Sequence, residues 1–191
     1  MSRDAVLRAA KRRFAVDGYE KTTLRSIADD AHVDPSMVLY LFGSKAELFR
    51  ESLRLIIDPD ALVAAIAEGD DDIGTRMVRT YLGIWEHPDT AASMVAMLAS
   101  ATSNPDAHEA FRAFMQSYVL TAVSAALGGV EHARLRAMLA ATNLVGTAIL
   151  RYVMRVEPLA TLPADDVVKL IAPAVNRYLS APADDLGLSG L

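Results

Sequence analysis

A short stretch of the chain, residues 23–45, holds side chains whose chemistry suits contact with a DNA duplex. Ser36 and Tyr40 carry hydroxyl groups that can hydrogen-bond to base edges. Met37 and Leu39 are apolar side chains of a size that can contact thymine methyl groups. On a helical wheel Ser36 and Tyr40 point away from the apolar face, with Met37 and Leu39 on its flanks. We therefore predict that these four residues face DNA bases.

Three further residues of this stretch can contact the sugar-phosphate backbone or support such contacts. Arg25 can reach a phosphate or a guanine edge, and Lys45 can bind a phosphate at the start of a helix. Thr23 can add a hydroxyl contact while it caps a helix. Each residue taken alone also fits a purely structural role, because Tyr40 could pack on a neighbouring helix and Lys45 could be an ordinary surface lysine. The ordered set of caps and turns is more specific than any single residue.

Two short helices must position these side chains. An apolar stripe at helical spacing predicts a helix over residues 24–31, capped by Thr23. The stripe consists of Leu24, Ile27, Ala28 and Ala31. Asp34 as N-cap and Pro35 at the first helical position then predict a helix over residues 35–42. Helix, tight turn and helix are typical of a helix-turn-helix, whose second helix lies in the DNA major groove.

Helices are also predicted on both sides of this motif. Residues 4–16 form a helix with a basic outer side, and Gly18 is a natural stop for it. Arg13 lies beside the apolar stripe of this helix, so we expect its stem to pack and its head to reach solvent. Ser44 and Glu47 have the spacing of a capping box at the start of a helix over residues 45–57.

The rest of the chain repeats the helical pattern, and an all-α fold is predicted throughout. Expected helices cover residues 60–68, 74–86, 90–101, 105–127, 131–156 and 164–180. The domain prediction is a helix-turn-helix DNA-binding domain over residues 1–57, a helical effector-binding and dimerisation domain over 58–180, and a flexible tail over 181–191.

The formal charge of −5 for the 191 residues does not itself suggest a DNA-binding protein. Its distribution is more informative, since residues 1–57 hold ten basic and eight acidic side chains. The remainder holds nine basic and sixteen acidic side chains and is net negative. Attraction to phosphate requires positive charge only at the contact face, so the asymmetry favours DNA contact by the N-terminal part.

Several classes of protein are disfavoured by what the sequence lacks. There is no cysteine, so disulfides, thiol catalysis and thiolate metal sites are excluded. The four histidines show no metal-binding spacing, and no nucleotide-binding or hydrolase motif occurs. We expect no signal peptide or membrane span, a cytoplasmic location, no cofactor, no metal and no enzymatic activity. A helical partner-binding or sensor protein without sequence-specific DNA binding remains open as the alternative.

With these motifs in place, residues 5–50 resemble the tetracycline-repressor (TetR) family of bacterial transcription regulators. The shared motifs are A-A-x-x-x-F over residues 9–14, Gly18-Tyr19, T-T-L-x-x-I-A over 22–28 and F-G-S-K-x-E-L-F over 42–49. The D-P-x-x-V motif at residues 34–38, together with residues 151–163 and 172–179, resembles an actinobacterial branch. Two positions depart from the family pattern, because His32 replaces a glycine in the turn and Arg13 replaces an apolar residue. Leu39 stands where many members carry tyrosine or histidine, and Tyr40 follows one place later.

The resemblance implies a helical homodimer that binds a palindromic operator in double-stranded DNA and responds to a small effector. Helices 105–127 and 131–156 are the predicted dimer interface. An effector would shift helix 45–57 and change the spacing of the two reading heads. Apolar and aromatic side chains could line the effector pocket, although methionine and aromatic side chains more commonly fill an ordinary core. These are Tyr81, Trp85, Met94, Met97, Leu98, Phe111, Phe114, Met115 and Tyr118. A repressor is the expected type of regulator, with activation left open.

Overall fold

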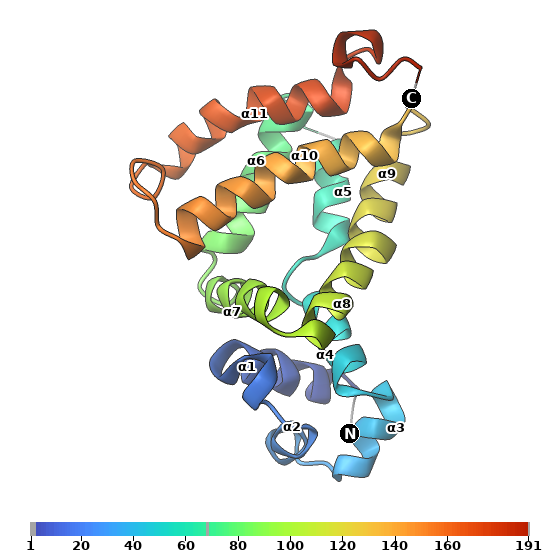
Figure 1. Ribbon diagram of the computed structural model, residues 1–191, viewed down its shortest axis with the longest axis vertical. Coiled ribbons are helices and arrows are strands. Elements are labelled where there is room, and N and C mark those ends of the chain that lie inside the picture. Colours follow the sequence, from blue (N-terminus) through green and yellow to red (C-terminus); the bar gives the residue numbers. More distant parts are fainter. Residues whose placement is uncertain (1–2, 68, 191) are drawn as a thin grey trace. The chain divides into compact units, whose positions relative to one another are not determined.

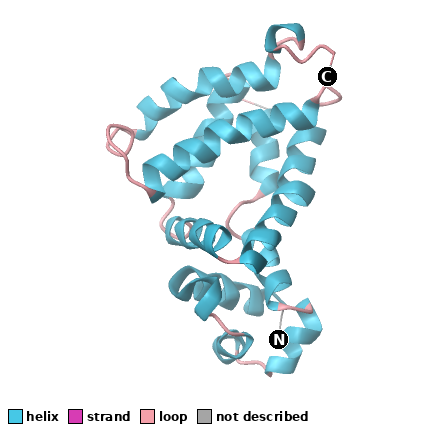
Figure 2. Ribbon diagram, viewed as in Figure 1, coloured by secondary structure: helices cyan, strands magenta, loops and turns pink. Residues whose placement is uncertain are grey.

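The computed structural model describes residues 3–67 and 69–190, and helices joined by turns account for these ranges without any strand (Figure 2). The predicted all-α class is therefore confirmed. The predicted helix 60–68 ends on a residue outside the described ranges, as do both extreme ends of the predicted domains. In chain order (Figure 1) the helices are α1 (Arg3–Lys21), α2 (Leu24–Ala31), α3 (Pro35–Phe42), α4 (Lys45–Leu53), α5 (Pro59–Ala67), α6 (Ile73–Glu86), α7 (Ala91–Ser103), α8 (Pro105–Phe114), α9 (Leu120–Ala126), α10 (Ala133–Ala148) and α11 (Ala164–Ser180).

Contacts divide the chain into two compact units. The first unit contains the chain up to Asp58 together with residues His87–Gln116, and the second contains Pro59–Glu86 and the chain from Ser117 onward. Helices α7 and α8 thus belong with the helix-turn-helix, because α7 packs on α1 and α8 packs on α4. The predicted domains, residues 1–57 and 58–180, place these two helices in the other half of the chain.

An aromatic cluster forms the centre of the first unit. Phe14 and Tyr19 from α1 lie with ring centroids 5.8 Å apart, and Phe49 from α4 meets them edge-on at 5.0 and 5.1 Å. The predicted inner side of the first helix is buried, as shown by Val6 and Ala10 at 0% exposure. The periodicity of apolar residues in α1 is therefore what orients the helix against α2 and α4.

The ends of α1 and α4 differ from the sequence predictions. Helix α1 runs beyond residue 16, and Gly18 interrupts it with φ 70° and ψ 175°. This conformation is accessible mainly to glycine, which confirms Gly18 as the point where the regular helix stops. Helix α4 ends at Leu53 rather than at 57, and single turns follow it through Ile56.

Two of the predicted long helices contain a π-helical turn. One spans Met115–Val119 between α8 and α9, and the other spans Ile149–Val153 after α10. A π turn adds a residue to one helical turn and shifts the side chains that follow it to another face. Apolar spacing at 3.6 residues per turn does not reveal such an insertion, so both regions read as uninterrupted helices in the sequence.

A buried arginine fixes the end of α11 in the second unit. Arg136 on α10 is 1% exposed, and its Nη1 donates to the carbonyl oxygens of Tyr178 at 3.1 Å and Ala181 at 2.7 Å. Its Nε donates to the carbonyl of Glu131 at 2.7 Å. The guanidinium therefore supplies donors to carbonyl groups that lack helical partners at a C-terminus and lies at the negative end of the helix dipole.

Residues 181–190, predicted as a flexible tail, fold back on α11. A short 3-10 helix covers Asp184–Leu186, and Leu188 is buried at 4% exposure. The Arg177 side chain donates to the carbonyl of Asp185 at 2.7 Å. These contacts hold residues 181–190 against α11, whereas the Pro, Gly, Asp and Ser content of the segment predicts a flexible tail. No described helix is long and apolar enough to span a membrane.

Candidate DNA-binding site

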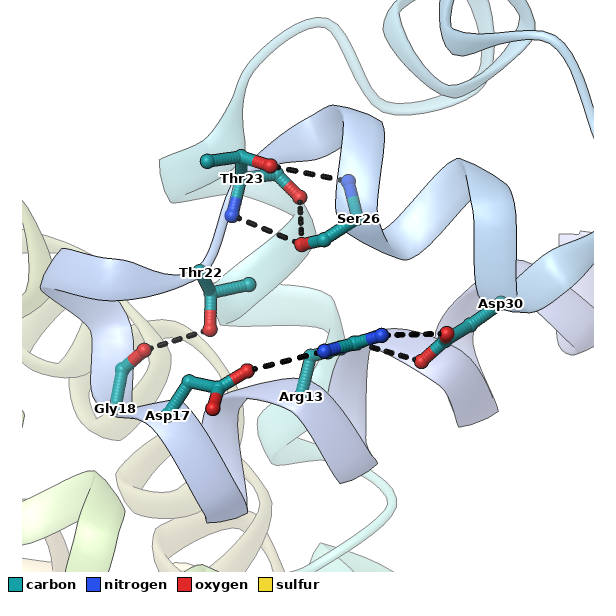
Figure 3. Close-up of polar contacts among 7 residues, drawn as sticks. All are labelled: Arg13, Asp17, Gly18, Thr22, Thr23, Ser26 and Asp30. Carbon is teal, nitrogen blue, oxygen red and sulfur yellow. Dashed lines mark hydrogen bonds and ion pairs between the residues drawn. The ribbon is translucent and has the colours of Figure 1, made fainter.

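Helix α2 begins with a reciprocal capping arrangement at Thr23. The Thr23 hydroxyl accepts from the Ser26 backbone N–H at 3.0 Å, and the Thr23 N–H donates to the Ser26 Oγ at 3.2 Å (Figure 3). This is a capping box with serine in place of the usual glutamate or glutamine. Thr23 is exposed, so its hydroxyl can still face a ligand. Ile27 and Ala28 are fully buried and hold the helix against the core.

His32 closes α2 in the left-handed conformation, with φ 54° and ψ 46°. The N–H of Val33 donates to the carbonyl of Ala28 at 3.0 Å, and the N–H of His32 donates to the carbonyl of Asp29 at 3.2 Å. These two bonds make a Schellman motif, in which glycine is the favoured residue at the left-handed position. The backbone at His32 therefore has the left-handed conformation that glycine usually adopts at this position. The Cβ of His32 makes this conformation less favourable than it would be for glycine.

Helix α3 presents the predicted base-facing residues to solvent. Asp34 caps it by accepting from the N–H of Ser36 at 2.8 Å and from its hydroxyl at 2.5 Å, and these bonds lower the pKa of Asp34. Val38 and Phe42 form its buried face. Ser36 and Tyr40 are exposed, and the exposed fraction of Tyr40 is 85%. A large aromatic side chain in that position has little role in the core of the monomer.

Met37 and Leu39 complete the exposed surface of α3. Both are about half exposed. The Ser36 hydroxyl donates its hydrogen to the Asp34 carboxylate, so its oxygen can accept a hydrogen bond from a ligand but has no hydrogen left to donate. The exposed Tyr40 hydroxyl is therefore the side-chain donor that this surface of α3 presents to solvent.

Lys45 occupies the first turn of α4 and is half buried. Its Nζ lies 4.4 Å from the centroid of the Tyr19 ring and donates to the carbonyl of Glu20 at 3.3 Å. Burial lowers the pKa of Lys45, while the nearby carboxylates of Glu20 and Asp106 act in the opposite direction. The ammonium retains further donors beyond the bond to Glu20, because it carries three.

Only one half of the predicted capping box at Ser44 is present. The Ser44 hydroxyl accepts from the N–H of Glu47 at 3.1 Å, but the Glu47 carboxylate pairs with Arg50 instead of returning to Ser44. The Ser44 N–H, which the missing half would have bonded, donates instead to the carbonyl of Phe42 at 2.9 Å. The backbone N–H groups of Lys45 and Ala46, in the first turn of α4, precede the first intrahelical bond and are the donors that lie beside the Lys45 side chain. Such donors and the positive end of the helix dipole both favour a phosphate.

Arg25 lies exposed in the first turn of α2. Among the described residues it makes no ion pair with a carboxylate. All seven residues predicted to contact DNA thus lie in the first unit, on α2, α3 or the start of α4, and each is exposed or half exposed.

The Arg13 side chain, predicted to pack its stem and reach solvent with its head, is 36% exposed, and its head is paired with carboxylates. Its guanidinium makes a two-bond pair with Asp30 near the end of α2 and a weaker contact with Asp17 at 3.4 Å (Figure 3). Arg13 can replace the apolar residue usual in the family because its planar guanidinium forms hydrogen bonds with both carboxylate oxygens of Asp30. Sequence spacing could not reveal this pair, since its members lie on different helices.

The nine predicted effector-binding residues are distributed over both compact units. Met94, Met97 and Phe114 are buried in the first unit, which also contains the half-buried Leu98, Phe111 and Met115. Tyr81 and Trp85 are buried in the second unit, and Tyr118 is half buried there. Burial of this kind suits both an ordinary core and a pocket lining.

A polar cluster surrounds Trp85 in the second unit. The Trp85 ring stacks on Tyr152 with centroids 5.2 Å apart, and Tyr152 donates to the carboxylate of Glu86 at 2.7 Å. Arg151 Nη2 approaches the same Glu86 carboxylate at 3.3 Å. The Nε of Arg151 is buried and meets no acceptor among the described residues. Native structures rarely leave such donors unpaired.

A separate apolar cavity of about 40 Å³ also lies in the second unit. Its lining includes Met77 on α6, Leu120 on α9 and Leu144 on α10. None of the nine predicted effector-binding residues lines this cavity.

The geometry described above can be compared with known proteins. The family model of bacterial regulatory proteins of the tetR family matches residues 6–52, which contain the helix-turn-helix. The model of the tetracyclin repressor-like C-terminal domain matches residues 71–179, more than half of the chain. The chain belongs to the TetR family of bacterial regulators. The resemblance predicted from the sequence motifs is thereby confirmed.

Solved structures agree with this assignment to the TetR family. A TetR-family regulator from Streptomyces coelicolor A3 is 36% identical, covers 93% of each chain and has a TM-score of 0.65. The multidrug binding protein EbrR shares the fold in complexes with imidazole and with ethidium, at 19% and 18% identity and TM-scores of 0.65 and 0.61. The imidazole complex covers 95% of this chain and 91% of its own, and the ethidium complex covers 92% and 96%. No match was found among curated proteins.

Proposed function

We propose that this TetR-family protein is a cytoplasmic transcriptional repressor that binds a palindromic operator as a homodimer and is released by a small apolar or aromatic effector. The observation that carries the proposal is the exposed surface of α3. The capped helix α3 exposes Tyr40 at 85%, and Met37 and Leu39 are exposed beside it. Side chains this exposed contribute little to the core of the monomer. In a helix-turn-helix this surface faces the major groove.

In the proposed complex, base contacts and backbone contacts come from different helices. Tyr40 and Ser36 hydrogen-bond to base edges, and Met37 and Leu39 contact thymine methyl groups. Lys45 binds a phosphate at the start of α4. The reading surface of α3 carries no charged side chain, so affinity depends strongly on phosphate contacts and sequence choice depends on few direct hydrogen bonds and DNA shape.

Arg25 and Thr23 add backbone contacts from α2. Arg25 reaches a phosphate or a guanine edge, and Thr23 contributes a hydroxyl at the same end of the helix. Their exposure at the first turn of α2 supports this role.

The homodimer is proposed to use the outer face of α10. Residues on this face lie at helical spacing on the side opposite the buried Arg136 and Leu144. The face is apolar or small almost throughout, with Leu135, Met138, Leu139, Thr142 and Gly146 on α10 and Ile149, Leu150 and Val153 in the π-helical turn that follows it. Such an unpartnered apolar face on a monomer favours association with a second copy.

Of the two helices predicted at the interface, the second is favoured by its surface. The exposed side of helix 105–127 carries His108, Glu109 and Arg112, which are polar or charged. Helix α11 packs on α10 and exposes a further large apolar side chain, Leu170, at 65%. We therefore propose α10 with α11 as the dimer surface.

The effector is proposed to bind in the helical domain near the aromatic residues predicted from the sequence. The buried Arg151 Nε, which meets no acceptor among the described residues, and the stacked rings of Trp85 and Tyr152 support an effector that carries a hydrogen-bond acceptor on an aromatic or apolar body. EbrR, which shares the fold, binds the aromatic molecules imidazole and ethidium. To release DNA, the effector must bind the DNA-incompetent state of the repressor more tightly than the competent state.

Selection of bound duplexes from a random pool, with and without aromatic compounds, tests the proposed function. A repressor of this kind yields one palindrome with two related half-sites, and a releasing effector reduces the recovery of that palindrome. A partner-binding protein that does not read DNA yields no enriched sequence.

A further inference from the structure

Both contacts of the Lys45 ammonium are made with the C-terminal end of α1. The Nζ lies over the Tyr19 ring, and it donates to the main-chain carbonyl of Glu20 at 3.3 Å. A lysine side chain is long and flexible, so its position depends on the groups that hold it. The position of Lys45 therefore depends on how residues 19 and 20 are fixed.

Residues of α7 and α8 fix this end of α1. The Tyr19 N–H, which follows the break at Gly18, donates to the buried Ser100 Oγ at 3.1 Å. The Asn104 Nδ2 donates to the Glu20 carboxylate at 2.6 Å. Each of the two residues that contact Lys45 is thus held by its own hydrogen bond from the α7–α8 pair.

Asn104 is itself rigidly placed. Its Oδ1 accepts from the N–H groups of Asp106 at 3.0 Å and Ala107 at 3.1 Å, so the side chain is the N-cap of α8. The amide oxygen of Asn104 thus accepts hydrogen bonds from α8, while its amide nitrogen donates to the Glu20 carboxylate. One side chain thereby ties the start of α8 to the end of α1.

We propose that Asn104 and Ser100 are positioning residues for DNA binding, which through Glu20 and Tyr19 hold Lys45 ready to contact a backbone phosphate of duplex DNA. The proposal rests on the proposed function. A lysine that is already ordered loses less conformational entropy when it binds a phosphate. Helices α7 and α8 of the first unit thereby influence DNA binding, since a displacement of either helix would move Tyr19 or Glu20 and, with them, the Lys45 ammonium.

The test is a double-mutant cycle between Asn104→Ser and Lys45→Ala. Serine keeps an N-cap oxygen for α8 but is too short to donate to Glu20. Dissociation constants for the selected duplex are measured by fluorescence anisotropy at several salt concentrations. Asn104→Ser is expected to weaken binding about three- to tenfold and to lower the salt slope by up to about 0.9, the value for one phosphate contact. In the Lys45→Ala background the same substitution is expected to have no effect.

Two further comparisons separate positioning from a general structural effect. Ser103→Ala is the matched control, because Ser103 lies next to Asn104 while its hydroxyl donates to the Ala99 carbonyl within α7 and to no other group in the described part of the chain. It is expected to leave affinity unchanged. Glu20→Gln keeps an acceptor for Asn104 and Glu20→Ala does not, although both remove the charge. The glutamine variant is expected to bind DNA more tightly than the alanine variant.

The outcomes distinguish this proposal from the function on which it rests. Equal weakening by Asn104→Ser in both backgrounds, or no weakening in either, overturns the positioning role. Equal affinities of Glu20→Gln and Glu20→Ala overturn it as well. If the unaltered protein prefers no duplex at all, the proposed function itself fails.

Discussion

Arg13 on α1 holds Asp30 on α2 through two hydrogen bonds, with Nε 2.6 Å from Oδ2 and Nη2 2.7 Å from Oδ1. The two helices belong to the same unit, and the pair fixes the end of α2 just before the turn that leads to the recognition helix. Its geometry is the bidentate form that arginine makes with a carboxylate and that lysine cannot reproduce.

Arg13→Lys is expected to lower the thermal unfolding midpoint by a few degrees, because the lysine keeps the charge and loses the two-bond geometry. Arg79→Lys is the control, since Arg79 pairs with Asp71 through one hydrogen bond, from Nη1, at an exposed position. Differential scanning calorimetry compares the two. Equal midpoints for Arg13→Lys and the unaltered protein would contradict a stabilising role for the pair.

The same pair predicts a pH dependence. The hydrogen bonds from Arg13 lower the pKa of Asp30 below its ordinary 3.8. A carboxylate whose pKa is lower in the folded state stabilises the fold above its unfolded pKa, and this stabilisation is lost as the pH falls through the folded value. The difference in midpoint between Asp30→Asn and the unaltered protein should therefore be present at pH 6 and shrink below about pH 3.8. A difference that stays constant over this range would contradict the assignment.

His32→Gly is expected to stabilise the protein by about 0.5–1 kcal/mol, because glycine adopts the left-handed conformation at the end of α2 without steric conflict. Urea unfolding followed by circular dichroism measures the change. Met37→Gly is the control at an exposed position within α3 and should destabilise by a similar amount. A loss of stability in His32→Gly would show that the imidazole makes a contribution larger than the backbone strain.

Tyr40→Ala is expected to change sequence preference without loss of stability, because the side chain is exposed. Loss of one base contact should reduce discrimination by about 1–3 kcal/mol at one position of each half-site. Lys45→Ala should instead weaken binding to all sequences and reduce the salt slope. Selection from a random pool with each variant tells them apart, and an unchanged preference for Tyr40→Ala would remove this residue from the reading surface.

Met138→Glu and Leu170→Glu are each expected to shift the protein from dimer to monomer at micromolar concentration. A carboxylate on the apolar face of α10 or α11 would be buried without a partner in the dimer. Ser117→Glu, on the polar exposed side of helix 105–127, is the control and should leave the dimer intact. Light scattering gives the mass of each variant. A monomeric mass for the unaltered protein would contradict the dimer.

The sequence predicts the helices around the turn most accurately because the signals there are local. Thr23, Asp34 with Pro35, and Ser44 each mark a helix start, and α2 and α3 have the predicted bounds. The capping side chain and the backbone it satisfies lie within three residues, so their spacing is visible in the sequence. The same reasoning locates Gly18 as the break in α1.

Features that depend on distant residues could not be predicted in this way. The pairing of Arg13 with Asp30 and of Tyr19 with Ser100 requires the packing of separate helices. Burial of Arg136 depends on carbonyl groups more than forty residues away along the chain. The exposed, apolar and aromatic character of the α3 surface was predictable, since it follows from helical periodicity alone.

The central claim, sequence-specific DNA binding through α3, is tested most directly by the affinity of the unaltered protein for its selected palindrome against a scrambled duplex of the same composition. Fluorescence anisotropy at physiological salt gives both dissociation constants. We expect a preference of about 10³-fold or more for the palindrome, with affinity falling as salt rises. Equal affinity for the two duplexes, or no binding to either, would contradict it.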